Sequence, residues 1–189
     1  ILEHHMSNYK DLSVVQVKSF PNISIRQGWL FWGFYGYSTI NHDYNLKTIG
    51  GDKVVVDNAT GLMWHQSGSD DEMDWDDAKG WIESLNSEEG YAGYHDWRLP
   101  TVDEAASLLE QDMEASSQNG GMYTDPVFST KQNWIWTGDK TDYKPTVFFI
   151  KRKLIGSEAA WGVIFNDGDV HWSYLYSYGR CVRPVRSME

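Results

Sequence analysis

The stretch GYHDWRLPTVDEAASLL, residues 93–109, decides the fold prediction because it marks where a helix begins. Thr101 is the expected N-cap, and Glu104 follows three residues later as the second half of a capping box. Pro100 prevents an upstream helix from continuing into this cap, since the residue before a proline avoids helical geometry. The residues expected on the buried face of the helix are Val102, Ala105, Leu108 and Leu109.

Trp97 and Arg98 lie directly before this helix, where they belong either to a functional site or to a structural joint. An arginine between a tryptophan and a leucine at a helix start is well placed to bond backbone carbonyls or a carboxylate such as Asp96. We therefore interpret Trp97 and Arg98 as structural residues. Ligand contacts are expected elsewhere in the chain.

Upstream of this stretch, the pattern predicts a hairpin and a first helix. KVVVDNATGLMW, residues 53–64, reads as strand, turn and strand, and its last residue is Trp64. A helix is expected from Trp75 to Leu85, because apolar residues recur there at helical spacing. Asp74 is the expected N-cap of this helix.

Downstream of residue 125, short runs rich in β-branched and aromatic residues predict strands. Asp167 and Gly168 form a hairpin signal, because an Asp-Gly pair accepts the positive φ angles of a type I′ turn. Two helices followed by a small antiparallel sheet predict an α+β domain. The predicted strand runs are NWIWTGDK (133–140), TVFFIK (146–151), AWGVIFNDGDVHW (160–172) and GRCVRPVR (179–186).

Composition and charge restrict the classes of partner. A chain of 189 residues, 41% hydrophobic and 15% aromatic, favours one globular domain over several or a disordered chain. Its formal net charge of -11 disfavours nucleic acid and sulfated polysaccharide, because the one basic run, Lys151 to Lys153, is short. No apolar run reaches the roughly 18 residues of a membrane span, so no membrane insertion is expected.

The chain divides into three segments. Residues 1–6, ILEHHM, are typical of an expression-vector remnant, so no function is assigned to them. Residues 7–49 are rich in aromatic residues and glycine without a sustained period. We expect this segment to wrap the main domain at 50–189; the alternative is an exposed contact surface for a neighbouring domain.

Seven blocks in order resemble the bacterial Lcl C-terminal domain family, long catalogued as a domain of unknown function. The blocks are VVDNATGLMW, WDDAKGWIESLN, YAGYHDWRLPTVDEAASLL, DPVF, WIWT, AWGVIFNDGDV and RCVRPV, over roughly residues 50–186. The resemblance implies a C-type-lectin-like fold, with two helices packed on a small twisted antiparallel sheet and long loops. It also implies a non-catalytic recognition domain, because members are surface adhesins or modules appended to other bacterial proteins, including kinases.

The chain departs from the family pattern in its cysteines. Many relatives carry a cysteine in the first helix that can pair with the cysteine of the terminal strand; here that helix position is Ile82, and Cys181 is the only cysteine. A reducing compartment is therefore acceptable. The resemblance favours a cell-surface or secreted location, while the single cysteine and the lack of a visible signal peptide keep a cytoplasmic one open.

The segment GDVHWSYLYSYG, residues 168–179, is the predicted ligand-binding region. Tyrosine, tryptophan, serine and aspartate are typical of adaptable recognition surfaces, because rigid rings supply contact area and hydroxyls supply hydrogen bonds. About half of these rings are expected to fill the core instead. The predicted contact residues are Asp169, His171, Trp172, Ser173, Tyr174, Tyr176 and Tyr178.

Metal binding and catalysis receive less support. The acidic run between Asp70 and Asp77 lacks EF-hand spacing, and Asn166-Asp167 lacks the proline loop of a lectin calcium site, so no cofactor is expected, although calcium stays open. Cys181 lies in a strand pattern, where a buried and inert thiol is expected. An enzyme would instead show perturbed titratable groups gathered in one cleft.

These observations predict a non-enzymatic domain that binds a protein or glycan through the C-terminal hairpin, with no prediction of its oligomeric state. Two alternatives stay open: a docking module of a larger protein, and a variable ligand-binding protein diversified by a retroelement. The residues expected to have structural roles are Trp64, Trp75, Trp97, Arg98, Thr101, Glu104, Asp167, Gly168 and Cys181.

Overall fold

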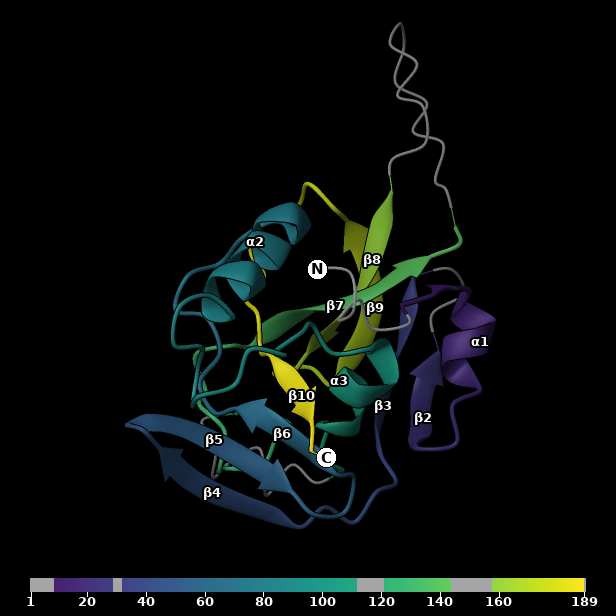
Figure 1. The fold of residues 1–189 in the computed structure, drawn as a ribbon. Coiled ribbons are helices and arrows are strands. Elements are labelled where there is room, and N and C mark those ends of the chain that lie inside the picture. Colours follow the sequence, from purple (N-terminus) through teal and green to yellow (C-terminus); the bar gives the residue numbers. More distant parts are fainter. Residues whose placement is uncertain (1–8, 29–31, 112–120, 144–157, 189) are drawn as a thin grey trace, which may run out of the picture.

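The structure is a computed structural model that describes residues 9–28, 32–111, 121–143 and 158–188. Within these ranges the chain forms three helices and ten strands (Figure 1). The helices are α1 (Val14–Lys18), α2 (Trp75–Leu85) and α3 (Val102–Ser107). The strands are β1 (Asp11–Leu12), β2 (Ile23–Gly28), β3 (Gly33–Ser38), β4 (Tyr44–Ile49), β5 (Asp52–Asp57), β6 (Leu62–His65), β7 (Trp134–Thr141), β8 (Ala159–Ile164), β9 (Asp169–Tyr174) and β10 (Val185–Ser187).

The strands form two sheets. A six-stranded sheet has the order β1-β7-β8-β9-β3-β2, and a four-stranded sheet has the order β10-β6-β5-β4. All neighbours are antiparallel except β1 and β7, which are parallel. The prediction of a C-type-lectin-like α+β domain, with two helices on one small antiparallel sheet, is therefore wrong. The described chain is dominated by its sheets, and its helices have only 5, 11 and 6 residues.

The N-terminal segment explains much of this error. Residues 11–49 supply four strands, although their sequence shows no sustained period. Strands β1, β2 and β3 belong to the six-stranded sheet, and β4 belongs to the four-stranded sheet. The ring of Tyr9 lies against the backbone of Gly138, and its hydroxyl donates to the Leu99 carbonyl at 2.8 Å. The segment is thus built into both sheets.

Several local predictions are confirmed. Helix α2 begins where expected, and the Asp74 carboxylate accepts the Asp77 N–H at 2.9 Å. At the N-terminus of α3, the Glu104 carboxylate accepts the Thr101 N–H at 2.8 Å. This helix ends at Ser107, because the backbone from Leu108 onward turns toward the six-stranded sheet, where the Leu109 carbonyl accepts the Ser38 N–H.

The two predicted hairpins are also present. Strands β5 and β6 pair on either side of the 58–61 turn, and β8 and β9 pair on either side of residues 165–168. The second turn is not the expected type I′, because Gly168 has φ of +72° while Asp167 is absent from the positive-φ residues of the described chain. Of the run at 179–186, only the last two residues enter a strand, β10. The TVFFIK run and the basic residues 151–153 lie outside the described residues.

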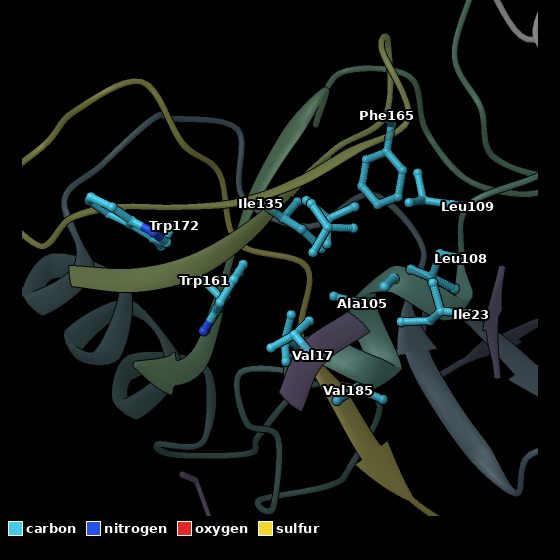
Figure 2. Close-up of a cluster of buried hydrophobic side chains, with 14 of the residues drawn as sticks. Val17, Ile23, Ala105, Leu108, Leu109, Ile135, Trp161, Phe165, Trp172 and Val185 are labelled. Carbon is cyan, nitrogen blue, oxygen red and sulfur yellow. The ribbon is translucent and has the colours of Figure 1, made fainter. Parts of the chain in front are cut away.

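The main core joins the two sheets around α3. Figure 2 shows Trp161 and Ile135 of the six-stranded sheet together with Ala105 of α3 and Val185 of β10. Each of these four side chains is fully buried, and burying a large apolar side chain contributes about 1.5–3 kcal/mol. This shared core fixes the position of α3 relative to both sheets.

A second core cluster covers the opposite face of the six-stranded sheet. Trp75 and Ile82 of α2 pack with Trp136 of β7 and Ala160 of β8. The Trp75 indole also donates to the Thr137 carbonyl at 2.8 Å. Helix α2 therefore covers only the β7–β8 part of this face.

At the joint before α3, Arg98 bonds a carbonyl, that of Leu99, and a carboxylate, as expected, but the carboxylate is that of Glu104 and not of Asp96. Arg98 donates to both carboxylate oxygens of Glu104, each at 2.7 Å. Asp96 instead accepts two hydrogen bonds from Arg186, at 2.6 and 3.1 Å. Trp97 is 2% exposed, and its indole donates to the Tyr91 carbonyl at 2.9 Å.

Candidate functional site

Strand β9 places the predicted contact residues on opposite faces of the six-stranded sheet. Side chains alternate along a strand, so Trp172 and Tyr174 point one way while Asp169, His171 and Ser173 point the other way. Trp172 and Tyr174 pack on the main core. A ligand that packs on one face of the sheet therefore cannot contact both sets of side chains.

The first set belongs to what we call the aromatic surface, formed by Trp32, Tyr143, Trp172, Tyr174 and Tyr176. Trp172 is its buried centre, with 2% of its surface exposed. Trp32 stacks on Trp172 with ring centroids 4.8 Å apart, and Tyr143 lies 5.4 Å from the same ring. Tyr174 meets Trp172 edge to face at 5.9 Å, and Tyr176 stacks on Tyr174 at 5.3 Å.

Three segments far apart in the sequence build this surface. Trp32 precedes β3, and its carbonyl accepts the Trp172 N–H at 3.3 Å. Tyr143 follows β7, Tyr174 is the last residue of β9, and Tyr176 lies in the turn after it. Tyr176 is 62% exposed, Trp32 54% and Tyr143 48%, so the rings around the buried centre face solvent.

Three tyrosine hydroxyls of this surface have no hydrogen-bond partner among the described residues. No hydrogen bond to the hydroxyl of Tyr143, Tyr174 or Tyr176 is made by the described residues. Burial raises the pKa of Tyr174, and its neighbours Tyr176 and Tyr143 add to this rise. The Tyr174 hydroxyl therefore keeps its proton at neutral pH and can donate a hydrogen bond.

The opposite face of β9 carries a cluster formed by Trp134, Ser173 and Arg180, which we call the polar strap. The guanidinium of Arg180 lies 3.6 Å from the centroid of the Trp134 ring and reaches the Ser173 hydroxyl at 2.7 Å. It also donates to the Tyr178 carbonyl. The Trp134 ring lies against Gly162 of β8. A Cβ added to Gly162 would be 2.9 Å from the Trp134 indole nitrogen.

His171 and Asp169 lie beside this strap. His171 Nδ1 is 2.8 Å from Asp169 Oδ2, and the imidazole meets the Trp134 ring edge to face at 5.0 Å. Three buried atoms here lack a hydrogen-bond partner among the described residues: Asp169 Oδ1, Trp134 Nε1 and Arg180 Nε. Burial lowers the pKa of Arg180 to about 10, so its guanidinium stays charged at neutral pH. Because these three atoms are buried, we interpret them as structural supports of this sheet face and not as ligand contacts.

Tyr178 belongs to neither set. It is 66% exposed, and its hydroxyl lies 3.5 Å from the carboxylate of Asp77 in the first turn of α2. The exposed ring provides a natural control position, because it resembles Tyr176 in exposure but does not stack on the rings of the aromatic surface.

Comparison with protein families matches most of the chain to a known domain. The family model of the Lcl C-terminal domain matches residues 53–186. The chain belongs to this family. Comparisons with curated proteins and with solved structures returned no match.

In this Lcl C-terminal domain, part of the aromatic surface comes from outside the family match. Trp32 precedes residue 53, whereas the other four rings lie within 53–186. Sequence reasoning missed Trp32 and Tyr143 as partners of Trp172. The aromatic richness of residues 27–45 was the one signal for Trp32, and Tyr143 carried none, because only strand pairing brings it near β9.

The described residues of the Lcl C-terminal domain contain no group of three or more His, Cys, Asp or Glu side chains able to hold a metal ion. Within the acidic run, Asp74 caps α2, Asp76 pairs with Lys79 at 2.8 Å, and Asp70 pairs with Lys131 at 3.0 Å. In the same described ranges, no helix is long and apolar enough to cross a membrane.

Two further groups with perturbed pKa values, His65 and Tyr91, lie away from β9. Burial lowers the pKa of His65 to about 4, and burial raises the pKa of Tyr91 to about 12. The two rings stack at 3.9 Å, and Tyr91 lines a cavity of about 550 Å³. His65 Nδ1 accepts the Gly68 N–H at 2.9 Å. We therefore interpret this imidazole as a structural group that holds the loop after β6. Cys181 is 4% exposed, and burial raises the pKa of its thiol.

Proposed function

We propose that this domain is a non-catalytic recognition module that binds a protein or glycan ligand on the aromatic surface. The observation that carries the proposal is the gathering of three exposed rings, Trp32, Tyr143 and Tyr176, around the buried Trp172. Exposed apolar residues scattered singly need no explanation, but a contiguous cluster from three separate segments is typical of an interaction site.

The chemistry of the rings suits recognition. Aromatic side chains bury a large area while immobilising only two side-chain torsions, so they contribute contact energy at a low entropic cost. The hydroxyls of Tyr174 and Tyr176 add directional hydrogen bonds. Because Trp172 is held by Trp32 on one side and by Tyr174 on the other, the surface is organised before a ligand arrives.

The proposed set of ligand-contact residues differs from the set that the sequence suggested. We assign ligand contact to Tyr174 and Tyr176 together with Trp32 and Tyr143, around Trp172. Asp169, His171 and Ser173 lie on the other face of β9 in this proposal, where they brace Trp134 and Arg180. Tyr178 flanks α2 and is outside the contact set.

The first test is a binding screen of the purified domain on glycan and surface-protein arrays, with calcium and with a chelator. The variant is Trp32→Ser combined with Tyr176→Ser, because both side chains are more than half exposed and neither belongs to the main core. Trp172→Ser is unsuitable, since it would empty a buried position. Tyr178→Ser is the matched control.

We expect one ligand class to bind the wild type and Tyr178→Ser equally, with or without calcium, and to lose binding in the double variant. Circular dichroism and thermal unfolding confirm that the variants are folded. Binding that survives the double variant refutes the site, and the absence of any array ligand transfers support to a docking role in a larger protein.

A further inference from the structure

We propose that His42 is a doubly protonated imidazolium that fastens the N-terminal segment to the rest of the domain, and that the fastening weakens when a rise in pH removes a proton from this ring. His42 precedes the residues that the family model matches, 53–186, whereas its two main partners, Asp57 and Ser107, lie within them. This fastening is independent of the ligand of the aromatic surface.

His42 lies where three elements meet. It belongs to the connection between β3 and β4, along which the chain passes from the six-stranded sheet to the four-stranded sheet (Figure 1). Asp57 is the last residue of β5, and Ser107 is the last residue of α3. The His42 side chain is 6% exposed and that of Asp57 is fully buried. One shielded imidazole therefore joins the N-terminal segment to a sheet and to a helix.

Both ring nitrogens of His42 face hydrogen-bond acceptors. Nδ1 is 2.7 Å from Asp57 Oδ2, and Nε2 is 2.7 Å from the carbonyl oxygen of Ser107. A backbone carbonyl can only accept a hydrogen bond, and so can an ionised carboxylate. A neutral imidazole carries one N–H, so its second nitrogen would direct a lone pair at an oxygen lone pair. Both contacts are therefore hydrogen bonds only if both nitrogens carry protons.

The Asp57 carboxyl is ionised, so it cannot supply the missing proton. Its Oδ1 accepts the N–H groups of Asp43 and Ala59, each at 3.1 Å, and its Oδ2 accepts the Thr60 hydroxyl at 2.5 Å. Burial raises the pKa of this carboxyl, but the hydrogen bonds, led by that of Thr60, outweigh burial and hold the pKa below its ordinary value. A buried carboxylate without a counter-charge is costly, and the imidazolium of His42 supplies that charge.

The other groups around the ring also favour a positive charge. Tyr44 stacks on His42 with ring centroids 4.8 Å apart, and burial raises the pKa of this phenol, which stays neutral. Asp43, next in the chain, carries a carboxylate that accepts a hydrogen bond from Asn58. The charged groups that act on the Tyr44 phenol are the carboxylates of Asp57, Glu110 and Asp125 and the guanidinium of Arg183. Carboxylates thus outnumber cations among the described groups near the stacked rings, which favours the protonated imidazole.

Loss of one proton from His42 removes more than one interaction. One of its two hydrogen bonds is lost, and the buried Asp57 carboxylate loses its counter-charge. The contribution of His42 to stability is therefore present at lower pH and is lost as the pH rises. The direction is opposite to that of His65, whose burial favours the neutral ring. Strand β4 and the end of α3 should open first, because they adjoin the ring.

The first test is the charge state of the ring in the wild-type chain. Nuclear magnetic resonance of the whole chain labelled with ¹⁵N-histidine, with the ring signals assigned through the backbone, reports how many protons each imidazole carries. An imidazole in water is mostly neutral at pH 7.5. We expect the two ring nitrogens of His42 to show the doubly protonated pattern at that pH. A neutral pattern for His42 at pH 7.5 overturns the proposal, and this measurement needs no variant.

The second test is amide hydrogen exchange of the whole chain at pH 6.5 and 8.5, expressed as protection factors so that the intrinsic pH dependence of exchange cancels. In the wild type, protection in β4 and at the end of α3 should fall by about ten-fold or more at the higher pH. His42→Gln should lack this fall, because its amide does not titrate. His95→Gln is the matched control, since its ring is exposed, and should behave as the wild type does. Protection that is the same at both pH values in the wild type, or that falls equally in His42→Gln, refutes the fastening.

Discussion

Arg98 and Glu104 form a two-point ion pair, with both nitrogen-to-oxygen distances at 2.7 Å, across the first turn of α3. The same Glu104 carboxylate accepts the Thr101 N–H, so one side chain both caps the helix and holds the preceding loop. Arg98 also pairs through its backbone with Val185 of β10. The pair therefore ties α3 to the four-stranded sheet.

Removing either partner should destabilise the fold. Arg98→Ala and Glu104→Gln are each expected to lower the free energy of unfolding by about 2–3 kcal/mol, less than for a fully buried pair because both side chains are 17% exposed. Urea denaturation measures the loss, and a double-mutant cycle with Glu104→Ala isolates the coupling. Lys79→Ala, which breaks the exposed pair with Asp76, should change stability very little. Equal losses at both sites would contradict the assignment.

His65 should make stability depend on pH. Burial lowers its pKa to about 4 in the folded state, whereas an unfolded histidine titrates near 6.5. The unfolded chain therefore binds a proton that the folded chain excludes between these values. Its contribution is fully present above about pH 6.5 and declines as the pH falls toward 4, by about 3 kcal/mol in total.

The check compares urea midpoints at pH 7.5 and 5.5 for the wild type, His65→Gln and His95→Gln. His65→Gln should reduce the loss of stability on acidification, whereas His95→Gln, whose ring is exposed, should keep it. An unchanged pH dependence in His65→Gln would show that another group controls it.

The hydroxyl of Tyr44 is buried, and no described residue hydrogen-bonds it. Burial, with Asp57 as the next cause, raises the pKa of this phenol, which stays protonated. Because an unsatisfied buried hydroxyl is costly, Tyr44→Phe should leave stability unchanged or increase it by about 1 kcal/mol. Thermal unfolding measures this. Tyr91→Phe is the contrast, since it loses a 2.8 Å hydrogen bond to the Lys53 carbonyl and should destabilise the protein by about 1 kcal/mol.

Gly138 should be intolerant of a side chain. A Cβ there would lie 2.0 Å from the ring of Tyr9, so Gly138→Ala must displace that ring and its hydrogen bond to Leu99. We expect a loss of about 1–3 kcal/mol and faster amide hydrogen exchange in β1. Gly80→Ala in α2 meets no heavy atom within 4 Å and should be neutral or stabilising by up to about 1 kcal/mol. Identical effects at the two glycines would refute the packing of Tyr9 on β7.

The sequence by itself determined the features that depend on neighbouring residues. The Asp74 cap, the Thr101 and Glu104 pair and the β5–β6 and β8–β9 hairpins each rest on residues within a few positions of one another. Local hydrogen bonding and hydrophobic periodicity decide such elements, so they can be recognised before folding is considered. The ordered sequence blocks likewise predicted the family, which the match to residues 53–186 confirms.

Only the tertiary structure decided what depends on distant residues. Arg98 pairs with Glu104 and not with Asp96, which is closer in the sequence, because Asp96 pairs with Arg186 near the end of the chain. Trp32 and Tyr143 reached Trp172 because β3 pairs with β9 and β7 lies two strands away in the same sheet. Strand pairing depends on which faces bury together across the whole chain, and that choice is made by the common core rather than by any local pattern.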